Sequence, residues 1–143
     1  MYRIEVIADI FLSLESMTQK KLQKLCYYAQ AYYLAKHKRE LTDSTFEAWV
    51  HGPVSPDLYR EYRRYNWNKI PKRELSYNYG DLVEFIISIY DEFGTYDADE
   101  LEEMTHNEKP WIEARTGLFD YEPSNNVISK STMIEYYSRK IAS

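Results

Sequence analysis

The fold is decided by one stretch of the chain, LQKLCYYAQAYYLAKH, residues 22–37. Its apolar residues recur at the spacing of one helical face: Leu22, Leu25, Cys26, Ala29 and Tyr33. Tyrosines at positions 27, 28 and 32 widen that face, which is typical of a central helix that neighbours contact from several sides. We therefore predict a helix that ends near His37 and lies at the centre of the protein.

Similar patterns before and after this stretch predict further helices. Ser16 and Thr18 offer N-cap hydroxyls to the central helix, and Gln19 lies three residues after Ser16 as in a capping box. Asp97 with Glu100 repeats this geometry, and prolines at positions 56 and 110 suit the first position of a helix. Besides the central helix, we predict helices near residues 4–14, 56–65, 81–93, 98–104, 110–115 and 130–142.

A short extended segment is predicted between the central helix and the helix at Pro56. Residues 45–50 alternate with a period of two, so they indicate a strand near residues 45–51. The following Gly52-Pro53-Val54-Ser55-Pro56 predicts a stiff turn into the next helix, because proline restricts the residue before it and glycine tolerates unusual backbone angles. The expected fold is mainly α: one compact domain, residues 1–143, with about six to seven helices.

The composition fits a soluble globular protein. Hydrophobic residues make up 44% of the chain and charged residues 29%, so we expect a packed core. No apolar run approaches the roughly 18 residues that span a bilayer. The single cysteine, Cys26, has no partner for an intramolecular disulfide and lies on a helical apolar pattern. We expect a cytoplasmic protein with no membrane contact, in which Cys26 is buried.

The sequence lacks the signatures of common catalytic and cofactor sites. It has no GxSxG or HExxH motif, and four glycines are too few for a phosphate-binding loop. For the histidines we expect a helix-end cation at His37, a turn residue at His51 and a hydrogen-bonded residue at His106. We therefore expect no catalytic residue, no metal site and no cofactor, in a protein that is not an enzyme. One alternative stays open, a hydrolase or metal-dependent enzyme built from His51, His106 and Glu108.

Fifteen tyrosines and three tryptophans in 143 residues are an excess of aromatic side chains. Most of them fall on helical stripes, and we expect those in the core. The tyrosines of the central helix and of the helix after Pro56 circle too much of each helix to be buried together. Exposed tyrosines are favoured contact groups at protein interfaces. We predict a partner-binding surface composed of Tyr28, Tyr32, Tyr59, Tyr62, Arg63 and Tyr65.

Charge is distributed unevenly along the chain. The net charge of −5 repels nucleic acid, and residues 91–108 hold eight acids with no lysine or arginine, which complements a basic protein. Between Arg60 and Arg73, however, six basic residues face one acid and are interleaved with aromatic residues, which suits single-stranded nucleic acid. We expect protein binding, and the alternative is a nucleic-acid-binding regulator that uses Arg60, Arg63, Arg64, Lys69 and Lys72.

Three segments taken together resemble a known family. They are residues 21–31 (KLQKLCYYAQA), residues 46–54 (FEAWVHGPV) and residues 105–111 (THNEKPW). In this order and spacing they resemble the Panacea domain, also described as SocA-like and common in bacterial and prophage genes. The resemblance covers most of the chain, from the first helix to about Arg115.

The resemblance implies an antitoxin that neutralises a toxin encoded by the adjacent gene, mostly by direct binding. It places the protein in the cytoplasm of a bacterial or phage-infected cell. The family also includes a proteolytic adaptor, which delivers its toxin to a protease. The motif residues that we expect to have a structural role are Trp49, Gly52, Pro53, Pro56, His106, Pro110 and Trp111.

Overall fold

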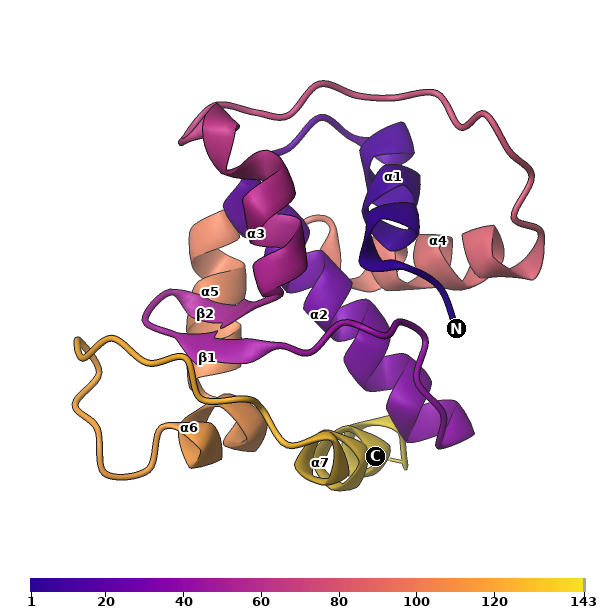
Figure 1. The fold of residues 1–143 in the computed structure, drawn as a ribbon. Coiled ribbons are helices and arrows are strands. Elements are labelled where there is room, and N and C mark those ends of the chain that lie inside the picture. The colour runs from indigo at the N-terminus through magenta and orange to yellow at the C-terminus, as the bar shows by residue number, and fades with distance from the viewer. Residues whose placement is uncertain (143) are drawn as a thin grey trace.

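The computed structural model describes residues 1–142. Within this range it has seven α-helices and a two-stranded antiparallel sheet, which confirms the predicted mainly α fold (Figure 1). No helix of this range combines the length and the apolar character needed to cross a membrane. The elements in chain order are α1 (Ile4–Leu14), α2 (Gln19–His37), β1 (Glu47–Trp49), β2 (Gly52–Val54), α3 (Pro56–Tyr62), the 3-10 helix η1 (Arg63–Tyr65), α4 (Asp81–Phe93), α5 (Ala98–His106), α6 (Lys109–Ala114) and α7 (Lys130–Ala142).

Helix α2 is central, as its sequence predicts. Helices α1, α3, α4, α5 and α7 and strand β2 all pack against it. Every residue from 22 to 31 is buried, so this part of α2 has no solvent-facing stripe. Cys26 lies in this part, and burial raises the pKa of its thiol far above the ordinary value. The prediction that Cys26 is a buried hydrophobic residue is confirmed.

The start of α2 differs from the prediction. Thr18 is the N-cap, and its hydroxyl accepts a hydrogen bond from the backbone N–H of Lys21 (3.3 Å). The hydroxyl of Ser16 instead donates to the carbonyl of Ile70 (2.7 Å), and the backbone of Met17 pairs with Ile70 in an isolated bridge. The predicted capping box from Ser16 is therefore wrong, because Ser16 holds a distant segment against the connection between α1 and α2.

The predicted extended segment forms the first strand of a small hairpin. Strand β1 pairs antiparallel with β2, and Ala48 lies opposite Pro53. Residues 52–54 are thus a strand, and the chain reverses two residues earlier than predicted, at Val50 and His51. On the other edge of β1, the N–H of Ala48 donates to the carbonyl of Asn126 (2.8 Å). The β1 edge of the hairpin is therefore joined to a segment that is distant in sequence.

Helix α3 begins as predicted and ends early. Ser55 is its N-cap, accepting a hydrogen bond from the N–H of Leu58 (3.3 Å), and Pro56 occupies the first position. The helix stops at Tyr62, and residues 63–65 tighten into η1 before Asn66 adopts a positive φ of 52°. The prediction that one helix runs to Tyr65 is therefore wrong, because the chain tightens into a 3-10 turn after Tyr62 and leaves the helical conformation at Asn66.

A polar network inside the core joins α2 to α7. The buried carboxylate of Glu108 accepts hydrogen bonds from the hydroxyls of Tyr28 (2.9 Å) and Tyr137 (2.8 Å). The hydroxyls of Tyr27 and Tyr137 lie 3.0 Å apart. Burial raises the pKa of Glu108, and the hydrogen bonds from Tyr137 and Tyr28 oppose that rise. Because each hydroxyl has a partner, these tyrosines can be buried without leaving an unsatisfied polar group.

Gly52 has no room for a side chain: its φ is +109°, and an added Cβ would lie 2.4 Å from Cε of the buried Lys24. We expect Gly52→Val to lower the free energy of unfolding by about 2–5 kcal/mol through backbone strain and overpacking together. The measurement is urea denaturation followed by circular dichroism.

Gly117→Val is the matched control. Gly117 also has a positive φ, +88°, but nothing lies within 4 Å of an added Cβ. Its free energy of unfolding should fall by on the order of 1 kcal/mol, from backbone strain alone. If the free energy of unfolding falls equally in the two variants, Gly52 does not approach Lys24 closely.

Candidate partner-binding site

The three sequence segments that resemble one family meet at the hairpin. The side-chain amide of Gln23, on α2, makes two hydrogen bonds with the backbone of Ser55. Its Oε1 accepts from the N–H of Ser55 (2.8 Å), and its Nε2 donates to the carbonyl (3.2 Å). The hydroxyl of Ser55 lies 2.6 Å from that of Ser44. The end of the hairpin and the start of α3 are thus fixed to α2 by buried polar contacts.

Lys24 adds a second contact from α2 to the hairpin. Its side chain is almost completely buried, and Nζ donates to the carbonyl of Pro53 (3.2 Å). Burial lowers the pKa of Lys24 from 10.5 to about 7; Lys20 contributes to that lowering and Glu102 opposes it. A buried amine with such a pKa is a common feature of catalytic sites. Here the amine bonds a backbone carbonyl and is closed off from solvent, so its observed role is to hold the hairpin.

The third segment holds the hairpin from the side of α6. The indole N–H of Trp111 donates to the carbonyl of Trp49 (2.9 Å). The ring of His106 stacks on that indole, with centroids 4.0 Å apart, and the guanidinium of Arg115 packs against it at 4.9 Å. Arg115 also donates to the carbonyl of Ala48 (2.8 Å). Of the motif residues, Trp111 and His106 therefore act on the strand that carries Trp49.

The residues of the enzyme alternative contact different partners. His51 is exposed on the hairpin turn, and its Nδ1 lies 3.1 Å from a carboxylate oxygen of Glu102. His106 stacks on Trp111, and Glu108 is bound by the two core tyrosines. Among residues 1–142, no group of three histidine, cysteine or acidic side chains is arranged to hold a metal ion. Each of these three residues therefore has its own set of partners in this structure.

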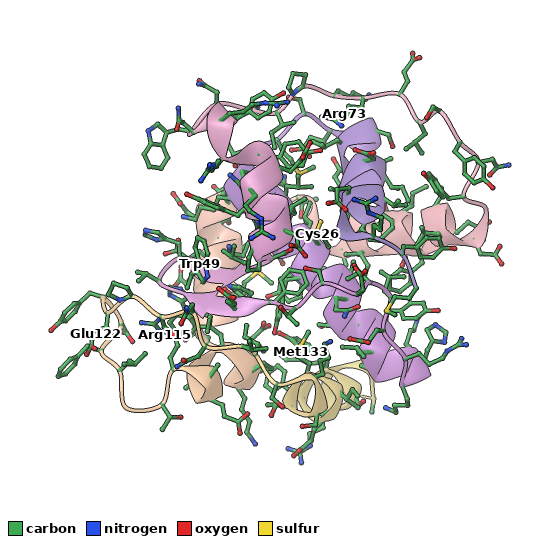
Figure 2. All side chains as sticks on the ribbon, viewed as in Figure 1. Cys26, Trp49, Arg73, Arg115, Glu122 and Met133 are labelled. Carbon is green, nitrogen blue, oxygen red and sulfur yellow. The ribbon has the colours of Figure 1, made fainter. Side chains whose placement is uncertain are left out.

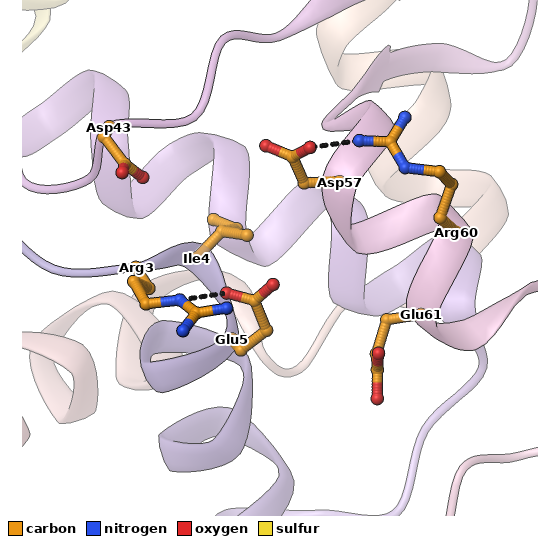
Figure 3. A pocket seen from close by; sticks show the side chains of 7 residues that line it. All are labelled: Arg3, Ile4, Glu5, Asp43, Asp57, Arg60 and Glu61. Carbon is orange, nitrogen blue, oxygen red and sulfur yellow. Dashed lines mark hydrogen bonds and ion pairs between the residues drawn. The ribbon is translucent and has the colours of Figure 1, made fainter.

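A surface hollow lies between the start of α1 and α3, and several of the charged side chains that line it are paired with each other (Figure 3). Arg3 pairs with Glu5 at 3.6 Å, and Arg60 pairs with Asp57. The hollow is open, and its lining is charged rather than apolar. The residues that line it are Arg3, Ile4, Glu5, Asp43, Asp57, Arg60 and Glu61. Its lining holds four carboxylates and two guanidiniums, and no histidine, cysteine or serine.

The predicted partner-binding residues divide into buried and exposed groups. Tyr28 and Tyr62 are buried, so the prediction that they face a partner is wrong. Tyr28 stacks on Phe93 at 4.2 Å while Glu108 accepts from its hydroxyl, and the guanidinium of Arg73 lies 5.5 Å from the ring of Tyr62. For Tyr28 the prediction failed because α2 has neighbours on several sides, so more rings are buried than one helical face can hold. Tyr62 lies on α3, which packs against both α1 and α2.

Tyr59 and Arg63 are the exposed residues of the predicted site, and together with Trp49, which was predicted as a structural residue, they form what we call the hairpin–α3 surface. Tyr59 and Arg63 are exposed, and the half-buried Trp49 meets the ring of Tyr59 edge to face at 4.9 Å. Tyr32 and Tyr65 are half-buried. The hairpin–α3 surface rests directly on the segments that Gln23 and Lys24 hold.

Two exposed rings were missed by the sequence analysis. Phe119 and Tyr121 lie in the loop after α6, and both are more exposed than Tyr59. The available signal was the presence of two aromatic residues in a polar stretch that has no helical or strand periodicity. Such rings have no regular face through which to be buried.

Comparisons with known proteins identify a family match and one partial relative. The family model described as "Antitoxin SocA-like, Panacea domain" matches residues 22–112. Antitoxin SocA of Caulobacter vibrioides (strain NA1000 / CB15N) is 49% identical over 39 residues. That alignment covers 27% of this chain and 21% of the relative, so it spans about a fifth of the relative's length. No solved structure matches the chain.

The buried amine of Lys24 predicts a pH dependence of stability. Between pH about 7 and 10.5, the unfolded chain binds more protons at this residue than the folded chain does. The free energy of unfolding should therefore rise with pH across this window, by up to about 1.4 kcal/mol per pH unit. Urea denaturation at pH 7 to 10 measures it.

Lys24→Met should remove this rise, whereas Lys109→Met, at an exposed position on α6, should keep it. A slope that survives in Lys24→Met would show that another group causes it.

Proposed function

The chain belongs to the family of SocA-like antitoxins with a Panacea domain, and on that premise we propose that it neutralises a cognate toxin by direct binding. The family match covers 91 of the 143 residues, from α2 to α6. One observation carries the proposal: the three motif segments converge on the hairpin, and their buried polar groups hold backbone rather than a substrate pocket. This arrangement suits a rigid binding scaffold that acts without catalysis in the bacterial cytoplasm.

We infer that the hairpin–α3 surface contacts the toxin. Tyr59 is a rigid amphipathic ring, Arg63 is an exposed guanidinium, and both residue types are enriched among the residues that dominate binding energy. Trp49 supports Tyr59 from the strand that Trp111 and Arg115 hold. A surface fixed in this way loses little conformational entropy on binding.

The acidic stretch at residues 91–108 contributes less free charge than its sequence suggests. Asp97 and Glu100 form the capping box of α5. Asp99 and Glu102 pair with Lys20 at 2.7 and 2.6 Å, while Glu108 is buried in the core. The remaining three of the eight acids, Asp91, Glu92 and Glu103, have none of these roles and form no ion pair with the described residues. Charge therefore acts mainly on the rate and orientation of encounter with a basic toxin.

Co-expression tests the proposed function. The protein encoded by the adjacent gene should arrest growth, this chain should relieve the arrest, and the two should co-purify. Tyr59→Ser should reduce both rescue and co-purification, because it removes the anchoring ring. Tyr96→Ser is the matched control, since Tyr96 is equally exposed but lies between α4 and α5. If Tyr59→Ser keeps both rescue and co-purification, the toxin does not contact the hairpin–α3 surface through Tyr59.

Toxin abundance separates direct neutralisation from delivery to a protease. With direct binding, rescue should occur at an unchanged level of toxin on an immunoblot. A level that falls only when this chain is expressed would favour the proteolytic-adaptor alternative. If wild-type chain gives neither rescue nor a complex, the antitoxin proposal is wrong.

The nucleic-acid alternative is favoured by one observation, the exposed indole of Trp67 among basic residues. Trp67 is 92% exposed, with Arg63, Lys69 and Lys72 nearby in sequence and also exposed. The basic residues do not form one helix face, because they are distributed over α3, η1 and an extended segment. Arg60 is also paired with Asp57.

For this alternative we expect no retardation of single-stranded DNA or RNA in a gel at low salt, because the net charge is −5. Retardation that weakens with added salt and disappears in an Arg63→Ser, Lys69→Ser, Lys72→Ser variant would instead establish nucleic-acid binding.

A further inference from the structure

The loop between α6 and α7 presents two aromatic rings to solvent. Phe119 is 66% exposed and Tyr121 is 75% exposed. Their rings are parallel, with centroids 5.6 Å apart and planes inclined by 2°. Exposed rings that are already ordered against each other form a preorganised contact surface. We call Phe119 and Tyr121 the aromatic platform.

Arg115 holds the loop from inside. Its side chain is buried, and its NH2 group donates to the carbonyls of Phe119 (3.0 Å), Asp120 (3.4 Å) and Glu122 (2.5 Å). The NH1 group of the same guanidinium donates to the carbonyl of Ala48 on β1 (2.8 Å). A guanidinium has five N–H donors in a fixed plane, so it can set the course of the backbone that wraps around it.

Two further side chains fix the ends of the loop. The carboxylate of Glu122 accepts a hydrogen bond from the N–H of Phe119 (3.0 Å). The side-chain amide of Asn126 donates to the carbonyl of Ala114 (3.0 Å), and the backbone carbonyl of Asn126 accepts from the N–H of Ala48 (2.8 Å). The loop is therefore closed at both ends onto the hairpin and α6. Figure 2 shows Arg115 directly beside Glu122, on the same side of the molecule as Trp49.

The surroundings of the aromatic platform are acidic. Residues 116–127 contain two acids, Asp120 and Glu122, and no lysine or arginine. Neither acid forms an ion pair with a residue of the described chain, and Glu113 on α6 and Glu47 on β1 form none either. The charge of Arg115 is enclosed beneath the loop. The surface therefore combines ring faces with carboxylates that form no ion pair with the described residues.

We propose that the aromatic platform docks an arginine-bearing surface of the toxin. Guanidinium groups stack on aromatic faces and pair with carboxylates, so they match both components of this surface. The inference rests on the proposed function and names the chemistry of the partner. The platform and the hairpin–α3 surface share one frame, since Arg115 joins the loop to Ala48 and the next residue, Trp49, contacts Tyr59.

Calorimetry with the purified protein encoded by the adjacent gene tests the inference. Phe119→Ser combined with Tyr121→Ser should weaken binding at least tenfold, because it removes both ring faces. Asp120→Asn should weaken binding less and reduce its dependence on salt. Trp67→Ser, which removes another fully exposed ring, should bind as wild type does. Thermal melting checks that each variant is folded, and Tyr121→Ser alone replaces the double variant if that variant unfolds.

The outcomes distinguish this inference from the proposed function. If the wild-type chain does not bind, the antitoxin proposal fails and the inference fails with it. If wild type binds and the ring variant binds equally well, the antitoxin proposal stands and the platform is not the docking site. Sedimentation of the isolated chain supplies a second check. If the isolated chain forms a dimer and the ring variant does not, the platform binds a second copy of this chain. That result would overturn the proposal that it binds the toxin.

Discussion

The paired hydrogen bonds between Gln23 and Ser55 are the constraint on which the rest of the structure depends. Ser55 ends the hairpin and also caps α3, so one buried amide fixes both elements relative to α2. Lys24, the next residue on α2, bonds the carbonyl of Pro53. A buried polar group that loses its partner costs about 1–3 kcal/mol, so sliding the hairpin along α2 would break several such contacts at once. These contacts hold the hairpin–α3 surface in place.

The aromatic core follows from the central position of α2. A helix covered on every side must bury side chains that another helix would expose, and tyrosine can be buried only where its hydroxyl finds a partner. Glu108 provides that partner for Tyr28 and Tyr137 together. One carboxylate thereby lets α7 close over α2. The tyrosine excess of the sequence is largely a core feature, and the surfaces available to a partner carry fewer rings than the composition suggests.

Charged and polar side chains in this protein mostly organise backbone. Lys24, Trp111 and Arg115 each donate to a carbonyl of the hairpin. Arg115 extends this pattern to the loop after α6, where the same guanidinium reaches both β1 and the carbonyls around Phe119. A loop held in this manner presents its side chains as a strand or helix does. This connection makes the hairpin–α3 surface and the aromatic platform parts of a single rigid unit.

The sequence by itself determined the helices, the extended segment and the caps of α3 and α5, because apolar periodicity, N-cap hydroxyls and proline act within a few residues. It also determined the family, through three segments whose spacing is specific. Tertiary structure alone decided that Tyr28 and Tyr62 are buried, that Ser16 bonds Ile70 instead of capping α2, and that the rings of Phe119 and Tyr121 lie parallel. These outcomes depend on contacts between residues far apart in the chain, and no local pattern records how many neighbours surround a helix or which carbonyls a buried arginine will reach.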